Sequence, residues 1–398
     1  MTVSEILDDI RDEGVVAALK YTRLYDAIEL GQNDLIWHPL LQEPPVIDWE
    51  IAEAIDFAID QIRTFHEQTK PASVVTEPLP GVHLEERYHP LGRVGIYIPN
   101  GQFPLISTLL MTAIPARAAG VTEVLAAMSP RDRVFAQPLW TYVFQRLNIS
   151  DVLLLGGAQA IGALAYGLEN FSPVDFIAGP GNRYVAEAKR EVARRGLVGI
   201  DLYAGPSEVL VIANEMQWLD YVVSDLMAQA EHDRDARAEL VTTNPELAEV
   251  VRERTRELAS DMGMITVTEV ETLQDAVRVA NDRAPEHLGL MGAEVEALAD
   301  DIWTAGAIFV GPLAGQAFGD YVAGPSHVLP TGGVGRFQSG LSTRTFMKRI
   351  SVIQVSPTVS PKPYQHAAVL AHLEGLLRHE QSMRLRQSWL QTHGGTNL

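Results

Sequence analysis

The stretch VLVIAN, residues 209–214, is apolar up to its final asparagine. A run of strand length without alternating polar residues is typical of a strand buried on both faces. Seven similar runs occur between residues 94 and 312: VGIYIP (94–99), EVLAAM (123–128), DVLLLG (151–156), VDFIAGP (174–180), AELVTT (238–243), MITVTEV (264–270) and AIFVGP (307–312). Helix-length segments separate most of these runs, which indicates parallel sheets covered by helices.

These units are more numerous than one compact sheet usually holds. We therefore expect an α/β fold with two Rossmann-like domains, each built on a parallel sheet. The first domain is predicted at residues 94–208 and the second at residues 209–335. The N-terminal segment, residues 1–93, is predicted to be helical and to contribute to the second domain. Within it, residues 47–70 carry apolar side chains at helical spacing before Pro71.

The alternation of strands and helices ends after residue 335. Residues 336–398 are predicted to form a C-terminal extension with a strand at 349–356, a proline-containing link and one long helix at about 364–391. A helix that lies beyond both domains still has to bury its apolar stripe. We therefore expect a homodimer in which this helix is swapped and packs on the partner subunit.

Charge and composition exclude several classes of protein. The 398 residues include 31 Lys and Arg against 51 Asp and Glu, which gives a formal net charge of −20. Such a surface repels nucleic acid and anionic membranes, so neither is an expected partner. Cysteine is absent, so any metal must be held by nitrogen and oxygen ligands. An acidic N-terminus and the lack of a long apolar run predict a soluble, cytoplasmic protein.

Two glycine-rich segments follow predicted strands, although GxGxxG and GxxxxGK[ST] are both absent. They are GGAQAIGALAYG (156–167) and GPGNRY (179–184). Glycine lets the backbone approach a ligand closely, and N–H groups near a helix start attract anions. Each segment could equally be a tight turn. Gln159 and Asn182 stand where contacts to a nucleotide would be made.

Three other segments combine residues that suit acid–base or metal chemistry. APEHLGL (284–290) contains adjacent carboxyl and imidazole groups, which suggests either two bases beside a reacting carbon or a loop that ends a helix. GDYVAGPSHVLPTGG (319–333) holds an aspartate and a histidine in a segment too rich in Gly and Pro for a core element. In AQAEHD (228–233), Gln229 and His232 share a helix face and form either half of a metal site or part of a solvated face.

Taken together and in order, these segments resemble the L-histidinol dehydrogenase family. The matching segments are RVGIYIPNG (93–101), LLGGAQAIGALAYG (154–167), DFIAGPGNRYVAEAKREV (175–192), GLVGIDLYAGPSEVLVIA (196–213), AQAEHD (228–233), ANDRAPEHL (280–288), FGDYVAGPSHVLPTGG (318–333), SGLS (339–342) and EGLLRH (374–379). The resemblance spans nearly the whole chain and is weakest in the first seventy residues. IDLYAGPSE and APEHL are its most specific parts.

The resemblance implies an NAD-dependent oxidoreductase of histidine biosynthesis. Such an enzyme oxidises L-histidinol through L-histidinaldehyde to L-histidine, a four-electron change that uses two NAD molecules and one zinc ion per site. The zinc ligands would be Gln229, His232, Asp320 and His379, the catalytic bases Glu286 and His287, the further substrate contacts Ser207, His327 and Glu374, and the NAD contacts Tyr97, Gln159 and Asn182. The zinc ligands and the bases would also face the substrate.

The same resemblance assigns a role to each group. Zinc would orient the substrate and stabilise charge, His287 would take the alcohol proton, and Glu286 would activate water on the aldehyde. In the family, the final helix with Glu374 and His379 comes from the other subunit, which fits the expected dimer.

Three departures from the family pattern keep other functions open. Asn100 replaces a usual glycine, Gln102 and Phe103 begin an unusual segment, and Gly289 stands where an acid is more common. A relative that oxidises another small polar alcohol, such as a sulfonated diol, is the enzymatic alternative. A non-catalytic binding protein would be expected to lack part of the predicted site, and none of it is missing. A metal-dependent hydrolase would have no use for the two glycine-rich loops.

Overall fold

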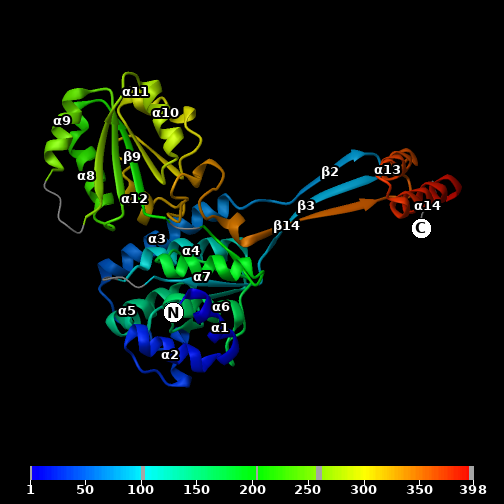
Figure 1. Cartoon of the computed structure of the whole chain (residues 1–398), viewed down its shortest axis with the longest axis horizontal. Coiled ribbons are helices and arrows are strands. Elements are labelled where there is room, and N and C mark those ends of the chain that lie inside the picture. The colour runs from blue at the N-terminus through cyan, green and yellow to red at the C-terminus, as the bar shows by residue number, and fades with distance from the viewer. Residues whose placement is uncertain (1, 100–103, 203–204, 257–261, 394–398) are drawn as a thin grey trace. The chain divides into compact units, whose positions relative to one another are not determined.

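The structure is a computed structural model that describes residues 2–99, 104–202, 205–256 and 262–393 (Figure 1). The chain divides into two compact units. The first unit comprises Met1–Lys70 and Leu91–Phe346, and the second comprises Pro71–Pro90 and Met347–Leu398. In the described parts of the chain, no helix has both the length and the apolar character needed to span a membrane.

The first unit contains two sheets, and the earlier one in the chain holds six strands. They are β1 (Ile36–Trp37), β4 (Arg93–Tyr97), β5 (Glu123–Ala127), β6 (Val152–Leu153), β7 (Phe176–Ala178) and β8 (Gly199–Ile200). Their order is β1-β6-β5-β4-β7-β8, with β1 antiparallel and the other pairs parallel. The chain runs outward from β4 in both directions, so the ends of β4 and β7 flank the switch point of a doubly wound sheet.

The second sheet repeats this arrangement with five strands. They are β9 (Glu208–Ala213), β10 (Arg237–Thr242), β11 (Met264–Glu269), β12 (His287–Met291) and β13 (Ala307–Val310). The order is β11-β10-β9-β12-β13, and all neighbours are parallel. Two parallel sheets confirm the predicted fold class. The run of residues 287–291 was not among the predicted strands, yet it lies inside the sheet with every residue buried.

Helices separate the strands of both sheets. Those of the first are α4 (Ile106–Ala119), α5 (Pro130–Arg146), α6 (Gly157–Tyr166) and α7 (Arg183–Arg194). Those of the second are α8 (Leu219–Ala230), α9 (Pro245–Arg254), α10 (Leu273–Arg283), α11 (Ala293–Glu296) and α12 (Gln316–Tyr321). Short 3₁₀ helices occupy Gln32–Asp34, Pro39–Leu41, Met216–Trp218, Ala299–Asp301, Val334–Arg336 and Thr343–Phe346.

The N-terminal helices are α1 (Val3–Glu13), α2 (Val15–Asp26) and α3 (Trp49–Gln68). We expected them to join the second α/β domain, but α1 and α2 share a core with the first sheet and α6. Their apolar side chains pack on the small residues of α6, where Leu7 lies 3.1 Å from the position that a Cβ of Gly162 would take. Helix α3 packs on α4, and its Phe65 lies against Gly324 of the later domain.

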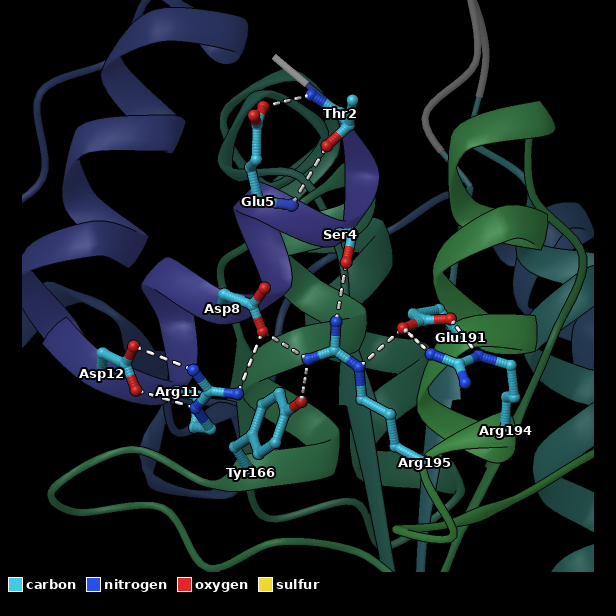
Figure 2. Close-up of polar contacts among 10 residues, drawn as sticks. All are labelled: Thr2, Ser4, Glu5, Asp8, Arg11, Asp12, Tyr166, Glu191, Arg194 and Arg195. Atoms are coloured by element: carbon cyan, nitrogen blue, oxygen red, sulfur yellow. Dashed lines mark hydrogen bonds and ion pairs between the residues drawn. The ribbon is translucent and has the colours of Figure 1, made fainter.

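A polar network fastens α1 to α6 and α7 (Figure 2). The guanidinium of Arg195, just after α7, donates to Asp8 and Ser4 of α1 at 2.7 and 2.9 Å. It also donates to Tyr166 of α6 at 2.7 Å and to Glu191 of α7 at 2.8 Å. One half-buried cation thus joins three helices, which explains why α1 belongs to this domain rather than to the later one.

The second unit contains an antiparallel sheet of β2 (Val74–Leu79), β3 (Val82–Pro90) and β14 (Met347–Val355), in the order β14-β3-β2. The prediction of a helical segment up to residue 93 is therefore wrong beyond α3. Strands form here because Gly81, with a φ of +81°, closes a tight turn between β2 and β3. Strand β3 also pairs with β14, which lies more than 250 residues later in the chain, as the register of Pro90 with Met347 shows, and no local pattern reveals that pairing.

The predicted single C-terminal helix is two helices, α13 (Lys362–Leu373) and α14 (Leu377–His393), which pack on each other. Gly375 has a φ of +73°. Its N–H donates to the carbonyl of His372, and the N–H of Leu376 donates to Ala371. This is the Schellman arrangement, which ends a helix by satisfying its last carbonyls.

Burial of His66 in α3 makes the stability of the first unit depend on pH. Its side chain is fully buried, neither ring nitrogen has a partner among the described residues, and burial lowers its pKa to about 4. Because the folded pKa lies below the unfolded value, the free energy of unfolding is highest above pH 6.5 and falls as the pH drops toward 4. A leucine at this position does not titrate. The difference in the free energy of unfolding between His66→Leu and the parent should therefore favour the variant by about 2 kcal/mol more at pH 5 than at pH 8.

Urea unfolding of both proteins at the two pH values measures this difference. His89→Leu, which alters an exposed histidine on β3, is the matched control. An identical pH dependence for the parent and His66→Leu would contradict the assignment.

Candidate active site

The residues singled out from the sequence gather at opposite ends of the two sheets. Tyr97 ends β4, Gln159 lies in the first turn of α6 after β6, and Asn182 caps α7 after β7. All three follow the carboxyl ends of parallel strands, where ligands bind in doubly wound folds. Ser207 precedes β9, and Glu286 directly precedes β12. The predicted catalytic groups therefore lie at the amino ends of the second sheet.

The backbone of Glu208 holds both predicted bases. Its N–H donates to Oε2 of Glu286 at 2.9 Å. Its carbonyl oxygen lies 3.3 Å from Nδ1 of His287. The two bases are themselves 3.6 Å apart, from Oε2 to Nδ1. Parallel pairing of β12 with β9, with His287 opposite Val209, creates this arrangement.

Burial shifts the pKa values of the two predicted bases. Glu286 and His287 are 6% and 5% exposed. Burial raises the pKa of Glu286 to about 7, against the opposing effect of the neighbouring imidazole. Burial also acts to lower the pKa of His287, but the hydrogen bond to Asp320 and the charges of both carboxyl groups raise it overall. A carboxyl group that titrates near neutrality, paired with an imidazole, is suited to general acid–base catalysis.

Asp320 lies at the centre of a group of imidazoles. Its Oδ1 is 3.2 Å from Nε2 of His287, and its backbone carbonyl is 3.0 Å from Nδ1 of His327. Burial acts to raise its pKa, but His287, His327 and His232 lower it overall. Asp320 and His327 lie in and after α12, so the glycine-rich segment 319–333 does face the predicted bases.

Gln229 and His232 lie at the end of α8. Gln229 is 1% exposed, and its Nε2 has no hydrogen-bond partner among the described residues. His232 is exposed, and its Nδ1 lies 3.1 Å from the carbonyl of Ala228, which leaves Nε2 for another contact. Within the described ranges, no three His, Asp or Glu side chains are close enough to hold a metal ion.

Glu374 and His379 belong to the second unit. Glu374 caps the end of α13, and His379 lies in the first turn of α14. His372, on the other side of the break, pairs through Nδ1 with Oε2 of Glu380 at 2.8 Å. His372 and His379 therefore lie on different helices.

The predicted NAD contacts shape the loops of the first sheet. The hydroxyl of Tyr97 accepts from the N–H of Gly157 at 3.0 Å, and burial raises its pKa to about 12. Gln159 is 2% exposed. Oδ1 of Asn182 accepts from Tyr184 and Val185 at 3.0 and 3.2 Å, so its amide nitrogen remains to donate. Asn100, Gln102 and Phe103 lie outside the described residues.

Sequence reasoning missed Glu208, although it follows Ser207 in the AGPSE segment. Its side chain adds a further link, since Oε1 accepts from the N–H of Gly332 at 2.6 Å. Gly289, a departure from the family pattern, lies inside β12, where a Cβ would meet Val211 at an ordinary 3.5 Å. It therefore adds no polar group to the site.

Known proteins match the sequence and the fold of this chain over almost its whole length. The sequence model of the histidinol dehydrogenase family matches residues 1–387. Histidinol dehydrogenase from Thermosynechococcus vestitus is 40% identical over 97% of this chain and 92% of its own length. The enzyme from Aquifex aeolicus is also 40% identical, with the same shares covered. The crystal structure of histidinol dehydrogenase from Elizabethkingia anophelis gives a TM-score of 0.89 at 30% identity and covers 98% of this chain and 92% of that one.

The fold and the site define an α/β protein with a buried carboxyl–imidazole pair at one edge of its second sheet. The extent of these matches places it more narrowly: the chain belongs to the histidinol dehydrogenase family. It is accordingly an oxidoreductase.

Gly179 allows the closest approach between the loops of the first sheet. Its φ is +114°, and a Cβ there would collide with the carbonyl oxygen of Tyr97. Gly179→Ala should cost at least about 3 kcal/mol of the free energy of unfolding, the sum of backbone strain and a backbone clash.

Gly196→Ala is the matched control, because its φ is +71° and no atom lies within 4 Å of its Cβ position. It should cost about 1 kcal/mol. Equal losses in urea unfolding would show that the approach to Tyr97 carries no strain.

Proposed function

We propose that the protein oxidises L-histidinol through L-histidinaldehyde to L-histidine with two NAD molecules and a zinc ion. The observation that carries this proposal is the buried pair of Glu286 and His287, held by one residue and facing Asp320. Family membership supports the substrate, since the relatives are histidinol dehydrogenases. The overall reaction converts the alcohol, water and two NAD⁺ into the carboxylate, two NADH and three protons.

The residues of the first unit are compatible with a zinc ion. Gln229 is 1% exposed at the end of α8, and its amide oxygen, rather than its nitrogen, is an atom that a metal can accept as a ligand. Asp320 supplies a carboxylate among imidazoles, and His232 contacts a backbone carbonyl through Nδ1, so that Nε2 remains to bind a metal. Nitrogen and oxygen ligands of these types suit zinc. We propose Gln229, His232, Asp320 and His379 as its ligands.

Zinc would polarise and orient the substrate when bound, and NAD would accept the hydrides. The protein's own groups move the protons. His287 accepts the proton of the alcohol, and the carbonyl of Glu208 and the carboxylate of Glu286 stabilise the resulting cation. Glu286 then accepts a proton from the water that adds to the aldehyde. Its pKa near 7 makes it a carboxylate at mildly alkaline pH, yet basic enough for this task.

NAD would bind at the carboxyl edge of the first sheet. Two of the four residues of the loop, Gly179 and Gly181, carry no side chain, and Asn182 keeps its amide donor at the start of α7. We propose Tyr97, Gln159 and Asn182 as the residues that contact or shape this site. Ser207, His327 and Glu374 complete the proposed substrate contacts.

We further propose a homodimer whose α13 and α14 supply Glu374 and His379 to the site of the other subunit. Apolar side chains on these helices support the proposal. Leu373 and Leu377 are 81% and 65% exposed, and Val369, Leu370 and Leu385 are exposed as well. A cluster of this kind is unusual on a monomer and is typical of an interface.

NADH formation by the zinc-loaded protein with L-histidinol as sole substrate tests the proposed reaction. We expect two NADH per histidinol, and EDTA should abolish them. Glu286→Gln should lower the rate with L-histidinaldehyde by a factor of about 10² to 10⁴. Glu239→Gln, which removes a partly buried carboxylate of β10 paired with Arg283 and Thr268, is the matched control and should retain the rate.

The outcomes separate the possible substrates. NAD reduction by another small polar alcohol, such as a sulfonated diol, without turnover of histidinol would reject the proposed substrate but keep the reaction class. A protein that binds zinc but not NAD would reject dehydrogenase activity altogether.

The pH dependence of the aldehyde step follows from Glu286. Since the carboxylate is the active form, the rate should rise about tenfold per pH unit below its pKa and level off above it. With a pKa of about 7, the bend should lie near neutrality. A rate that is constant from pH 5 to 9 in the parent would rule out Glu286 as the base.

Leu377→Asp tests the proposed assembly. A charge placed in an apolar interface should dissociate the dimer in light-scattering measurements and lower zinc content, because His379 would no longer reach the other subunit. Leu313→Asp, at an 85% exposed leucine of the first unit, is the control. A dimer with full zinc content in Leu377→Asp would oppose the swapped arrangement.

A further inference from the structure

A buried ion pair contacts the glycine-rich loop of residues 179–182 that follows β7. Lys189 of α7 is 3% exposed, and its Nζ pairs with Oδ1 of Asp201, whose side chain is 1% exposed. Asp201 directly follows β8. Neither residue belongs to the acid–base groups or the proposed metal ligands, although both lie in segments that match the family, 175–192 and 196–213.

Both charged groups also bind the backbone of one residue, Gly179. Nζ of Lys189 donates to the carbonyl oxygen of Gly179 at 2.9 Å. Oδ2 of Asp201 accepts from the N–H of Gly179 at 2.7 Å. The ammonium, the carboxylate and the peptide groups of Gly179 therefore form a closed ring of hydrogen bonds, and both polar groups of this glycine are satisfied.

Gly179 begins the loop that leads to Asn182. The ion pair holds the first residue of this loop, and the side chain of Asn182 holds the last by capping α7. Because Gly179 also lies against the carbonyl of Tyr97, a small shift of the loop in that direction is blocked. The loop is thus held from three sides, at the edge of the sheet where a dinucleotide would bind.

Stability alone is a poor explanation for such a pair. Two charges lose their hydration on burial, and well-packed apolar residues of similar size are often as stable. An apolar pair, however, offers no hydrogen bonds to Gly179. The distinctive contribution of Lys189 and Asp201 is therefore geometric, since they fix the position of one peptide unit.

We propose that Lys189 and Asp201 are positioning residues for NAD, which hold the loop of residues 179–182 in the conformation that presents Asn182 to the dinucleotide. This inference rests on the proposed function, because it takes NAD as the ligand of that loop. It predicts that loss of the pair weakens NAD binding without removing the acid–base groups at the other sheet.

The test compares Lys189→Met and the double variant Lys189→Met/Asp201→Leu with the parent, all as full-length, zinc-loaded proteins. The double variant removes both charges, so no unpaired charge remains buried and folding is less affected. We expect the Kd for NAD, from calorimetric titration, and the KM for NAD to rise about tenfold or more in both variants. The kcat at saturating NAD and the KM for histidinol should stay within about twofold of the parent.

Arg117→Met is the matched control. Arg117 is a partly buried cation of the same domain that donates to backbone carbonyls of Val121, Thr122 and Asn148, away from the loop. It should lower the unfolding temperature without changing the Kd for NAD. Variants of the pair that bind NAD as the parent does, while losing stability as Arg117→Met does, would overturn the positioning role. A parent that binds no NAD would instead reject the proposed function on which the inference rests.

Discussion

The pairing of β9 with β12 is the constraint on which the proposed acid–base site depends. Glu208 holds Glu286 through its N–H and His287 through its carbonyl, so the register of two strands sets the distance between the two side chains. A slip of one residue would turn every side chain of β12 to the opposite face of the sheet. It would also displace Leu288 and Leu290 from the core, where both are fully buried. The geometry of the site is thus maintained by the same burial that stabilises the sheet.

The two sheets share a topology but use opposite ends. The first presents loops at the carboxyl ends of its strands, where glycine and backbone N–H groups favour a nucleotide. The second presents a carboxyl and an imidazole at the amino ends, where burial shifts their pKa values. The two domains belong to one compact unit and contact each other. Ser326, next to His327, donates to the carbonyl of Met111 on α4 at 2.9 Å.

The sequence predicted the repeating part of the fold well and the exceptions poorly. Apolar runs located most strands of both sheets because a strand covered on both faces needs apolar side chains throughout. The segment 287–291 escaped because it is short and begins with a histidine. The β2–β3 hairpin and the break at Gly375 escaped because each depends on one glycine with positive φ. The packing of α1 was misjudged, since an apolar stripe indicates that a helix is buried but not which domain buries it.

For the site, residue types alone left alternatives open, and the resemblance to the family grouped Glu286, His287 and Asp320; the structure brings these three together. Glu208, Lys189 and Asp201 lie in the matching segments as well, but their contacts could not be found in this way. Glu208 acts on the bases through its backbone, which every residue type carries, and the ion pair contacts a peptide unit that is distant in sequence.

By itself, the sequence determined the class of fold, the family and the chemical types available for catalysis, because hydrophobic periodicity and motifs are local properties of the chain. Only the tertiary structure decided which strand ends carry these groups and how far burial shifts their pKa values. It also decided which backbone groups hold them in place. Those properties depend on register and desolvation, which arise only when segments distant in sequence pack together.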